Sequence, residues 1–322
     1  MEHVRGAVIL HEDLCDHWLR WAKDARLTHL GVHKITRPNT ETSLNVLLHD
    51  LEEEGGRRHI EALEDMGITV EYELHTLSWL LPRDLFEKDP SLYRMNENGE
   101  RRNDIGYCPS NPEALDIITE NSYRLAKMLH QKSDNYFWWS DDVPKSVCHC
   151  PKCTERCLNG ADAAMIFANA VAKGVLAYNS AAKESYLAYS DAKTIPTIKP
   201  EKNVFLEFAP MSRNHNKPIS APTEEPSVKY LELLHGLLEI FPAEDAHILE
   251  YWVDNALYSG FKKPPVKVPF NHYVADCDVK TYTDLGIRKI KSFASYIDEE
   301  YYRLHGEPPL KEYGDVLAKY IK

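Results

Sequence analysis

Two adjacent carboxylates end an aromatic run and are followed closely by a group of cysteines. The stretch NYFWWSDDVPKSVCHCPKC covers residues 135–153 and contains Asp141 and Asp142. Paired carboxylates suit acid/base catalysis, because the charge of one raises the pKa of the other and can keep it protonated near neutral pH. The sequence therefore predicts Asp141 and Asp142 as catalytic residues.

The two carboxylates can serve one site only if the backbone changes course beside them. Neighbouring residues in a strand point to opposite faces, so a strand that continued through the pair would separate Asp141 from Asp142. Pro144 follows closely and favours a break in the strand at this point. The alternative interpretation is a helix cap or an ordinary pair of loop carboxylates.

The cysteines have a spacing that is typical of metal binding. Four of them lie within ten residues, in VCHCPKCTERC, and a C-x2-C pair is a common half of a zinc site. Cys108 follows the preceding predicted strand, so its loop should neighbour this one. We expect Cys108, Cys148, Cys150 and Cys153 to form a structural four-thiolate zinc site that braces both loops, with no cofactor for catalysis. The alternatives are reduced thiols, disulfides, or Cys157 as the fourth ligand.

Eight β-rich runs, alternating with amphipathic segments, must position these residues. The runs cover residues 6–10, 28–34, 68–74, 135–141, 184–190, 203–209, 247–253 and 287–293. Eight such units in 322 residues predict an α/β fold, a single-domain (β/α)8 TIM barrel over residues 1–322, with the C-terminal segment 296–322 packing on the barrel. An open doubly wound sheet is the alternative, but no glycine-rich turn follows the first run.

The ends of the predicted strands carry further candidates, because a barrel of this kind places its chemistry at the C-terminal ends of its strands. The candidate substrate-binding residues are His75, Trp79, Trp139, Tyr189, Asp191, Glu207, Glu250, Trp252 and Asp254. Flat aromatic rings suit the apolar faces of sugars, and glycoside hydrolysis needs a carboxylic acid and a second group that supports positive charge. An oligosaccharide or glycan is therefore the expected partner.

Composition argues against two other classes of partner. The formal charge is −12, with 50 acidic against 38 basic residues, and no basic stripe is present to bind nucleic acid. No run of 18 apolar residues is present, so we expect no membrane partner. The N-terminus MEHVRGAVIL lacks the features of a signal peptide. We expect a cytoplasmic protein, or a secreted or periplasmic one if a leader has been removed.

Several motifs together resemble a known family, and they extend from roughly residue 68 to the C-terminus. They are YELHTLSWLLPRDLFEKDPSLYRMNENGER, CPSNPEA, YFWWSDD with CHCPKC, YLAYSD, FLEFAP, YWVDNALYSGFKKPPVKVP and DEEYYRLHGEPPLKEYGDVLAKY. This set resembles glycoside hydrolase family 163, formerly catalogued as domain of unknown function 4838.

The resemblance implies a (β/α)8 barrel similar to endo-β-N-acetylglucosaminidases. It implies retaining, substrate-assisted cleavage of a β-linked N-acetylglucosaminide, in which the 2-acetamido oxygen of the substrate attacks the anomeric carbon. By the same resemblance, Asp141 would orient the acetamido group and Asp142 would be the general acid/base.

Two other functions remain open. A glycosidase acting on uronic acids, similar to α-glucuronidases, would need cations at the site, and Lys34, Arg83 and Arg213 are the candidates. A non-catalytic glycan-binding barrel would instead use tryptophans as platforms. The candidates for that role are Trp79, Trp138, Trp139 and Trp252.

Overall fold

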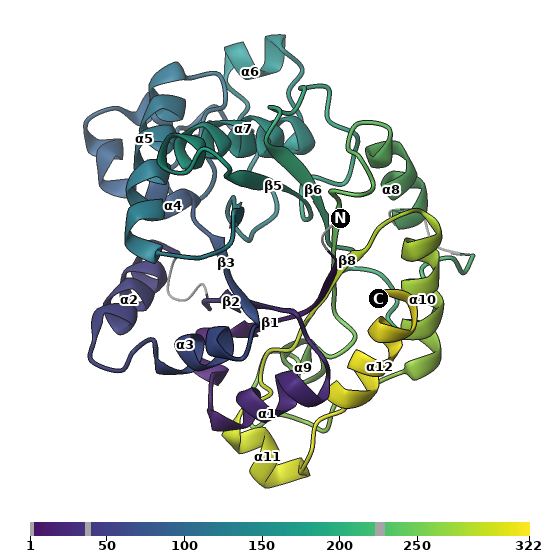
Figure 1. The fold of residues 1–322 in the computed structure, drawn as a ribbon. Coiled ribbons are helices and arrows are strands. Elements are labelled where there is room, and N and C mark those ends of the chain that lie inside the picture. Colours follow the sequence, from purple (N-terminus) through teal and green to yellow (C-terminus); the bar gives the residue numbers. More distant parts are fainter. Residues whose placement is uncertain (1–2, 36–39, 223–228) are drawn as a thin grey trace. The chain divides into compact units, whose positions relative to one another are not determined.

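The computed structural model describes residues 3–35, 40–222 and 229–322, and its strands form a closed barrel in the order β1 to β8. The strands are β1 Val4–Leu10, β2 His29–His33, β3 Thr69–His75, β4 Asn135–Trp139, β5 Lys183–Ala188, β6 Val204–Phe208, β7 His247–Glu250 and β8 Lys289–Phe293 (Figure 1). The strand pairs that are resolved in register are parallel. The prediction of a (β/α)8 barrel is confirmed.

Helices follow most of the strands, as the amphipathic segments predicted. They are η1 His11–Asp13, α1 Asp16–Asp24, α2 Thr40–Glu52, α3 Arg58–Asp65, α4 Leu77–Leu80, η2 Arg83–Glu87, η3 Pro90–Leu92, α5 Pro112–Leu129, α6 Pro151–Glu155, α7 Gly160–Tyr178, α8 Tyr230–Leu238, α9 Asn255–Tyr258, α10 His272–Asp284, α11 Glu299–His305 and α12 Leu310–Tyr320. The link between β5 and β6 contains no helix, which agrees with its two prolines.

Residue contacts group the chain into two compact units. The first unit comprises Met1–His33, Leu51–Glu71 and Glu207–Lys322, and the second comprises Lys34–Asp50 and Tyr72–Leu206. The paired aspartates and the cysteine group belong to the second unit.

In the first unit, the strands β1 and β8 pack closely around a buried ion pair. The amine of Lys291 lies 3.0 Å from the carboxylate of Glu71, and both side chains are fully buried. Gly6 makes room for this pair, because a Cβ atom at Gly6 would lie 2.6 Å from Cγ of Lys291. The helix α12 packs on α10, α1 and β1, and the Tyr313 hydroxyl donates to the Gly6 carbonyl over 2.6 Å. Residues 296–322 therefore pack against this part of the sheet.

In the second unit, β4 pairs with β3 and β5, and helices α5 and α7 pack against one another. The helix α5 begins at Pro112 with Asn111 as its N-cap, as predicted from the sequence. The helix α7 begins with a capping box between Asn159 and Asp162. These caps fix where each helix starts, and so they fix the loops that precede them.

By length and composition alone, α7 is able to cross a membrane. Buried core helices of soluble proteins pass the same test. In this helix, 67% of the most apolar 18-residue window is buried, and α7 contacts α5, β4 and β5. Its apolar character is explained by this packing.

Candidate active site

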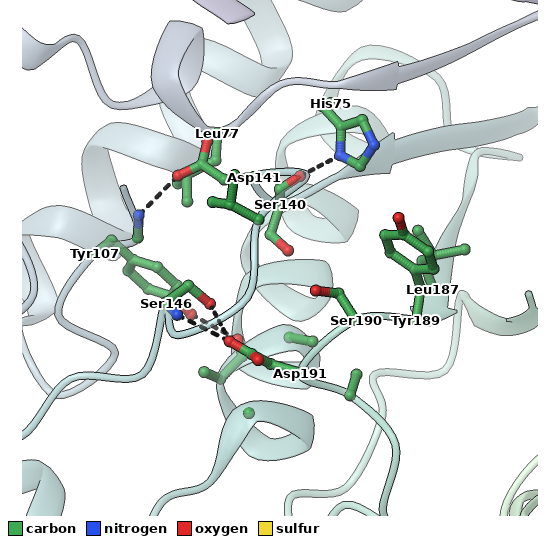
Figure 2. A pocket seen from close by; sticks show the side chains of 16 residues that line it. His75, Leu77, Tyr107, Ser140, Asp141, Ser146, Leu187, Tyr189, Ser190 and Asp191 are labelled. Carbon is green, nitrogen blue, oxygen red and sulfur yellow. Dashed lines mark hydrogen bonds between the residues drawn. The ribbon is translucent and has the colours of Figure 1, made fainter. Parts of the chain in front are cut away.

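The strand β4 ends at Trp139, so the chain has left the sheet before it reaches Asp141 and Asp142. This is the break that Pro144 predicted. A small cavity of about 30 Å³ lies beside this point, and its lining includes His75, Asp141, Tyr189 and Asp191 (Figure 2). The cavity has room for about two water molecules, so a sugar ring would have to bind over its opening.

Asp141 lines the cavity and is held by two donors from the loop after β3. Its Oδ2 atom accepts hydrogen bonds from the Gly106 amide over 2.7 Å and from the Arg83 guanidinium over 2.8 Å. Arg83 also donates to the Gly106 carbonyl over 2.7 Å, which closes a ring of three residues. The Asp141 side chain is only 7% exposed. Its orientation is therefore fixed before any ligand arrives.

Asp142 faces a different set of groups and is not among the residues that line the cavity. Its side chain is 41% exposed, and its Oδ1 atom accepts a hydrogen bond from the Tyr189 hydroxyl over 2.9 Å. The Nε2 atom of His75 lies 3.9 Å from the same oxygen, while Nδ1 of His75 lies 2.5 Å from the Ser140 carbonyl. Since a carbonyl only accepts, Nδ1 carries a hydrogen and Nε2 is the atom turned toward Asp142.

Asp191 lines the cavity and holds the loop that follows the acid pair. It accepts hydrogen bonds from the Lys145 amide (3.1 Å), the Ser146 amide (2.8 Å) and the Ser146 hydroxyl (3.0 Å). Gly160, at the start of α7, packs against it so closely that a Cβ atom there would lie 2.3 Å from the Asp191 carbonyl oxygen. Asp191 therefore supports this loop through its carboxylate while it lines the cavity, and its predicted contact with substrate stays a prediction.

The three tryptophans predicted in this unit differ in exposure. Trp139 is 3% exposed, and its indole nitrogen donates to the Ser185 hydroxyl over 3.2 Å, so it is a core residue with no open ring face. Trp138 is fully buried. Trp79 is half-buried on α4 and donates to the Asn45 side chain over 2.8 Å. Of these three rings, only Trp79 retains an exposed part.

Glu250 and Trp252, in the first unit, belong to a buried network built around Arg213. The guanidinium lies 3.1 Å from Glu250 and 2.5 Å from Asp278. The Tyr282 hydroxyl donates to Glu250 over 2.5 Å, and the indole of Trp252 donates to Asp278 over 3.0 Å. Burial and the neighbouring Glu250 raise the pKa of Asp278 to about 6. Glu250 and Trp252 are therefore both engaged inside the protein, and their predicted contact with substrate stays a prediction.

Glu207 and Asp254 are also buried in the first unit. Glu207 lies in β6, paired in register with His247, and is 0% exposed. Asp254 is the N-cap of α9 and accepts a hydrogen bond from the Ala256 amide over 3.3 Å. Desolvation raises the pKa of Asp254 to about 7. Asp254 therefore has a capping role in the structure, and its predicted contact with substrate stays a prediction.

The three cations considered for uronic-acid recognition each have a carboxylate partner within the protein. Lys34 lies 3.7 Å from Asp50, and Arg83 and Arg213 hold the carboxylates described above. A substrate carboxylate would have to displace these partners. The geometry therefore disfavours the uronic-acid alternative.

The sequence did not reveal that Arg83, Gly106 and Ser146 hold the acids. Arg83 was visible only as a nearby cation. Gly106 has φ +67°, and a Cβ atom there would lie 2.5 Å from the Ser146 carbonyl oxygen, so the residue must be glycine. Its position two residues before a predicted metal ligand was the available signal.

The four predicted metal ligands lie together in the second unit. The Sγ atoms of Cys108, Cys148, Cys150 and Cys153 all lie within 4.8 Å of one another, and all four residues are buried. Cys108 is 3.6 Å from Cys150 and 3.9 Å from Cys153, measured between sulfurs, which is too far for a disulfide. A tetrahedral zinc site with bonds of about 2.3 Å places its sulfurs about 3.8 Å apart. Cys157 is exposed and outside this cluster.

The surroundings of the cysteine cluster also suit thiolates. The Met95 amide donates to the sulfur of Cys148 over 3.3 Å, and the Ser110 hydroxyl lies 3.2 Å from the sulfur of Cys153. Outer hydrogen bonds of this kind orient metal ligands. Hydrogen bonding with Cys108 raises the pKa of Cys148 to about 11 and that of Cys153 well above its ordinary value. Hydrogen bonds with Cys148 and Cys153 lower the pKa of Cys108, so the charge of one thiolate opposes ionisation of its neighbours, and a bound cation would offset that repulsion.

Removing the partner of Asp141 should destabilise the protein. We expect Arg83→Met to lower the free energy of unfolding by about 2–4 kcal/mol, because it leaves a buried carboxylate without its charged partner. The control Arg102→Met, at a side chain that is 50% exposed, should change it by less than about 0.5 kcal/mol. Urea unfolding measures the free energy of unfolding of both variants. If Arg83→Met loses as little stability as the control, the pairing of Arg83 with Asp141 is contradicted.

The raised pKa of Asp254 predicts a pH dependence of stability. Its ordinary pKa is 3.8 and its folded value is about 7, so between these values the folded state keeps a proton that the unfolded state has released. Stability should fall as pH rises through this window, by on the order of 2–4 kcal/mol. Asp254→Asn keeps a capping side chain that does not titrate and should flatten the profile between pH 4 and about 7. Unfolding measured across that range checks this, and parallel profiles for the two proteins would contradict it.

Solved structures with the same fold include carbohydrate-related proteins of low sequence identity. The cellulose synthase subunit Z from Clostridioides difficile has a TM-score of 0.51 and 8% identity, covering 98% of this chain and 99% of that one. The β-galactosidase from Rahnella sp. R3 has a TM-score of 0.56 and 15% identity, with 99% of this chain matched to 56% of that one. A glycoside hydrolase family 5 enzyme from Prevotella bryantii B14, in complex with a xyloglucan tetradecasaccharide, has a TM-score of 0.54 and 11% identity over 96% and 86%. At these identities the likeness shows the fold alone.

No curated protein matches the chain in sequence. The sequence model of the domain of unknown function DUF4838 matches residues 18–308, which is most of the chain and reaches further toward the N-terminus than the motifs noted above. The chain therefore belongs to the DUF4838 family.

Proposed function

We propose that this protein is a retaining glycoside hydrolase of family 163 that cleaves a β-linked N-acetylglucosaminide in a glycan. The observation that carries the proposal is the unequal placing of two adjacent acids. The Asp141 side chain is held by two donors and is only 7% exposed, whereas the Asp142 side chain is 41% exposed and can reach a substrate oxygen. Substrate-assisted hydrolysis needs one acid of each kind.

In the first step, the 2-acetamido oxygen of the substrate attacks the anomeric carbon while the glycosidic C–O bond breaks. Asp142 donates its proton to the leaving oxygen. Asp141 accepts a hydrogen bond from the acetamido N–H, which increases the electron density on the attacking oxygen. Both hydrogen bonds to Asp141 from described residues use Oδ2, so Oδ1 is the oxygen assigned to the substrate.

In the second step, water opens the oxazolinium intermediate at the anomeric carbon. The Asp142 carboxylate takes a proton from this water, and the product keeps the β configuration. The Tyr189 hydroxyl donates to Asp142 and so stabilises its carboxylate between the two steps. The hydrogen bond from His75 to the Ser140 carbonyl keeps the imidazole beside the Asp142 carboxylate.

The non-catalytic alternative has lost most of its proposed platforms. Trp138, Trp139 and Trp252 are buried, and each is 3% exposed or less. Trp79 alone offers part of its ring to solvent. A single partly covered ring is a weak basis for glycan binding without catalysis.

The acid assigned to Asp142 can be tested directly. We expect Asp142→Asn to lower kcat on an aryl β-N-acetylglucosaminide at least about 10²-fold, because the leaving oxygen loses its proton donor. Asp116→Asn, at an exposed position of α5, should retain full activity. Turnover by the wild type should be inhibited by a thiazoline analogue, and an aryl glucuronide should not be hydrolysed. Equal rates for Asp142→Asn and wild type would remove Asp142 from the mechanism.

We also propose that Cys108, Cys148, Cys150 and Cys153 hold one structural zinc ion. The sulfur separations and burial of the cluster support this, and four thiolates leave no open position for substrate or water. No cofactor is then needed for catalysis.

Elemental analysis of the purified protein should find about one equivalent of zinc. Cys150→Ser should lose the metal and lower the melting temperature, because it removes one of four ligands. Cys157→Ser, at the exposed cysteine outside the cluster, should retain it. Zinc-free wild-type protein, prepared without chelators, would contradict the proposal.

A further inference from the structure

The loops that follow β3 and β4 meet backbone to backbone beside the cavity. The Gly106 amide donates to Asp141, and the α-carbon of Gly106 faces the Ser146 carbonyl so closely that no side chain fits between them. The Ser146 amide and hydroxyl donate to Asp191. The two carboxylates that line the cavity thus take hydrogen bonds from one contact between loops.

That contact continues directly into the cysteine cluster. Gly106 precedes Cys108 by two residues, and Ser146 precedes Cys148 by two residues. In each loop, the residue that donates a hydrogen bond to an aspartate is therefore only two residues from a buried cysteine of the cluster. A change in the separation of the sulfurs would move both donors.

Beyond the hydrogen bonds to Asp141, a few other protein contacts join the two loops, among them a hydrogen bond of 3.0 Å from Arg156 to the Ser110 hydroxyl. The His149 amide donates to the Met95 carbonyl over 2.8 Å, and the Met95 amide donates to Cys148. Contacts between neutral thiols are weak. Bonds from four thiolates to one divalent cation are much stronger and fix the sulfurs in one arrangement.

We propose that a divalent metal at the four cysteines acts as the positioning element of the candidate active site. With the metal bound, the donors Gly106 and Ser146 stay aligned on Asp141 and Asp191. Without it, the loops separate and the acids lose their orientation while the barrel stays folded. The catalytic meaning of this inference rests on the proposed function, but the coupling between metal and loops does not.

Hydrogen exchange of the full chain tests the coupling without any assay of activity. The protein is compared as purified, after zinc is released with a mercurial reagent that is then removed with thiol, and after zinc is added back. We expect the amides of Gly106 and Ser146 to exchange at least about tenfold faster in the stripped protein and to recover with zinc, since their protection depends on local closure. Peptides from α12 should not change. Unchanged protection of both amides in the stripped protein, or failure to bind zinc, would overturn the inference.

A matched pair of glycine variants tests the alignment of the two donors while the zinc stays bound. Gly106→Ala places a Cβ atom 2.5 Å from the Ser146 carbonyl and should misplace the donors while the cluster keeps its zinc. Gly99→Ala has a similar positive φ (+80°) but nothing within 4 Å, so it controls for backbone strain. We expect Gly106→Ala to lower kcat at least about tenfold and to shift its pH profile, with KM nearly unchanged. Wild-type kinetics for Gly106→Ala with zinc retained would contradict the positioning role.

If neither glycine variant nor wild type hydrolyses a 2-acetamido sugar, the proposed function fails while the exchange result still decides the coupling. If the wild type is active but its exchange is independent of zinc, the further inference fails and the proposed function stands.

Discussion

The hydrogen bond from the Gly106 amide to Asp141 is the interaction on which the candidate site depends most. Asp141 lies just beyond the end of a strand, where no sheet hydrogen bond constrains it. Its orientation comes instead from a backbone donor in another loop and from Arg83, which holds both the carboxylate and the Gly106 carbonyl. A buried carboxylate held by a backbone amide and a guanidinium has little freedom to turn, so this loop contact decides where the second acid of the pair can reach.

The difference between the two aspartates follows from this constraint. The Asp141 carboxylate gives up contact with water for two charge-assisted hydrogen bonds, from Gly106 and Arg83, and is held rigidly between the two loops. Asp142 follows it at the surface, where the Tyr189 hydroxyl is its partner and solvent has access. Two chemically identical and adjacent side chains thereby acquire different partners and different exposure, and the proposed mechanism assigns orientation to one and proton transfer to the other.

Much of the framework was predictable from residue patterns. Alternating β-rich and amphipathic segments indicated all eight strands, Pro144 indicated the break after β4, and the C-x2-C spacing with Cys108 in the neighbouring loop indicated the cysteine cluster. These are local signals or consequences of barrel topology, in which loops after consecutive strands are neighbours.

The environment of single side chains was less predictable. The position of Glu250 at a strand end suggested a contact with substrate, but it did not indicate that Arg213, from another loop, lies against it. Likewise, aromatic residues at strand ends suggested platforms, but burial of Trp139 and Trp252 depends on neighbours distant in the sequence. The role of Gly106 was hidden for the same reason, since it depends on the Ser146 carbonyl forty residues later.

The most direct test of the proposed chemistry is a crystal structure of the wild-type protein with a thiazoline analogue of N-acetylglucosamine bound. We expect the ring nitrogen of the analogue to lie within hydrogen-bonding distance of Asp141 Oδ1, with a carboxylate oxygen of Asp142 facing the position of the departing oxygen. A ligand bound elsewhere, or one that reaches Asp142 but leaves Asp141 bonded only to Gly106 and Arg83, would contradict the proposed chemistry.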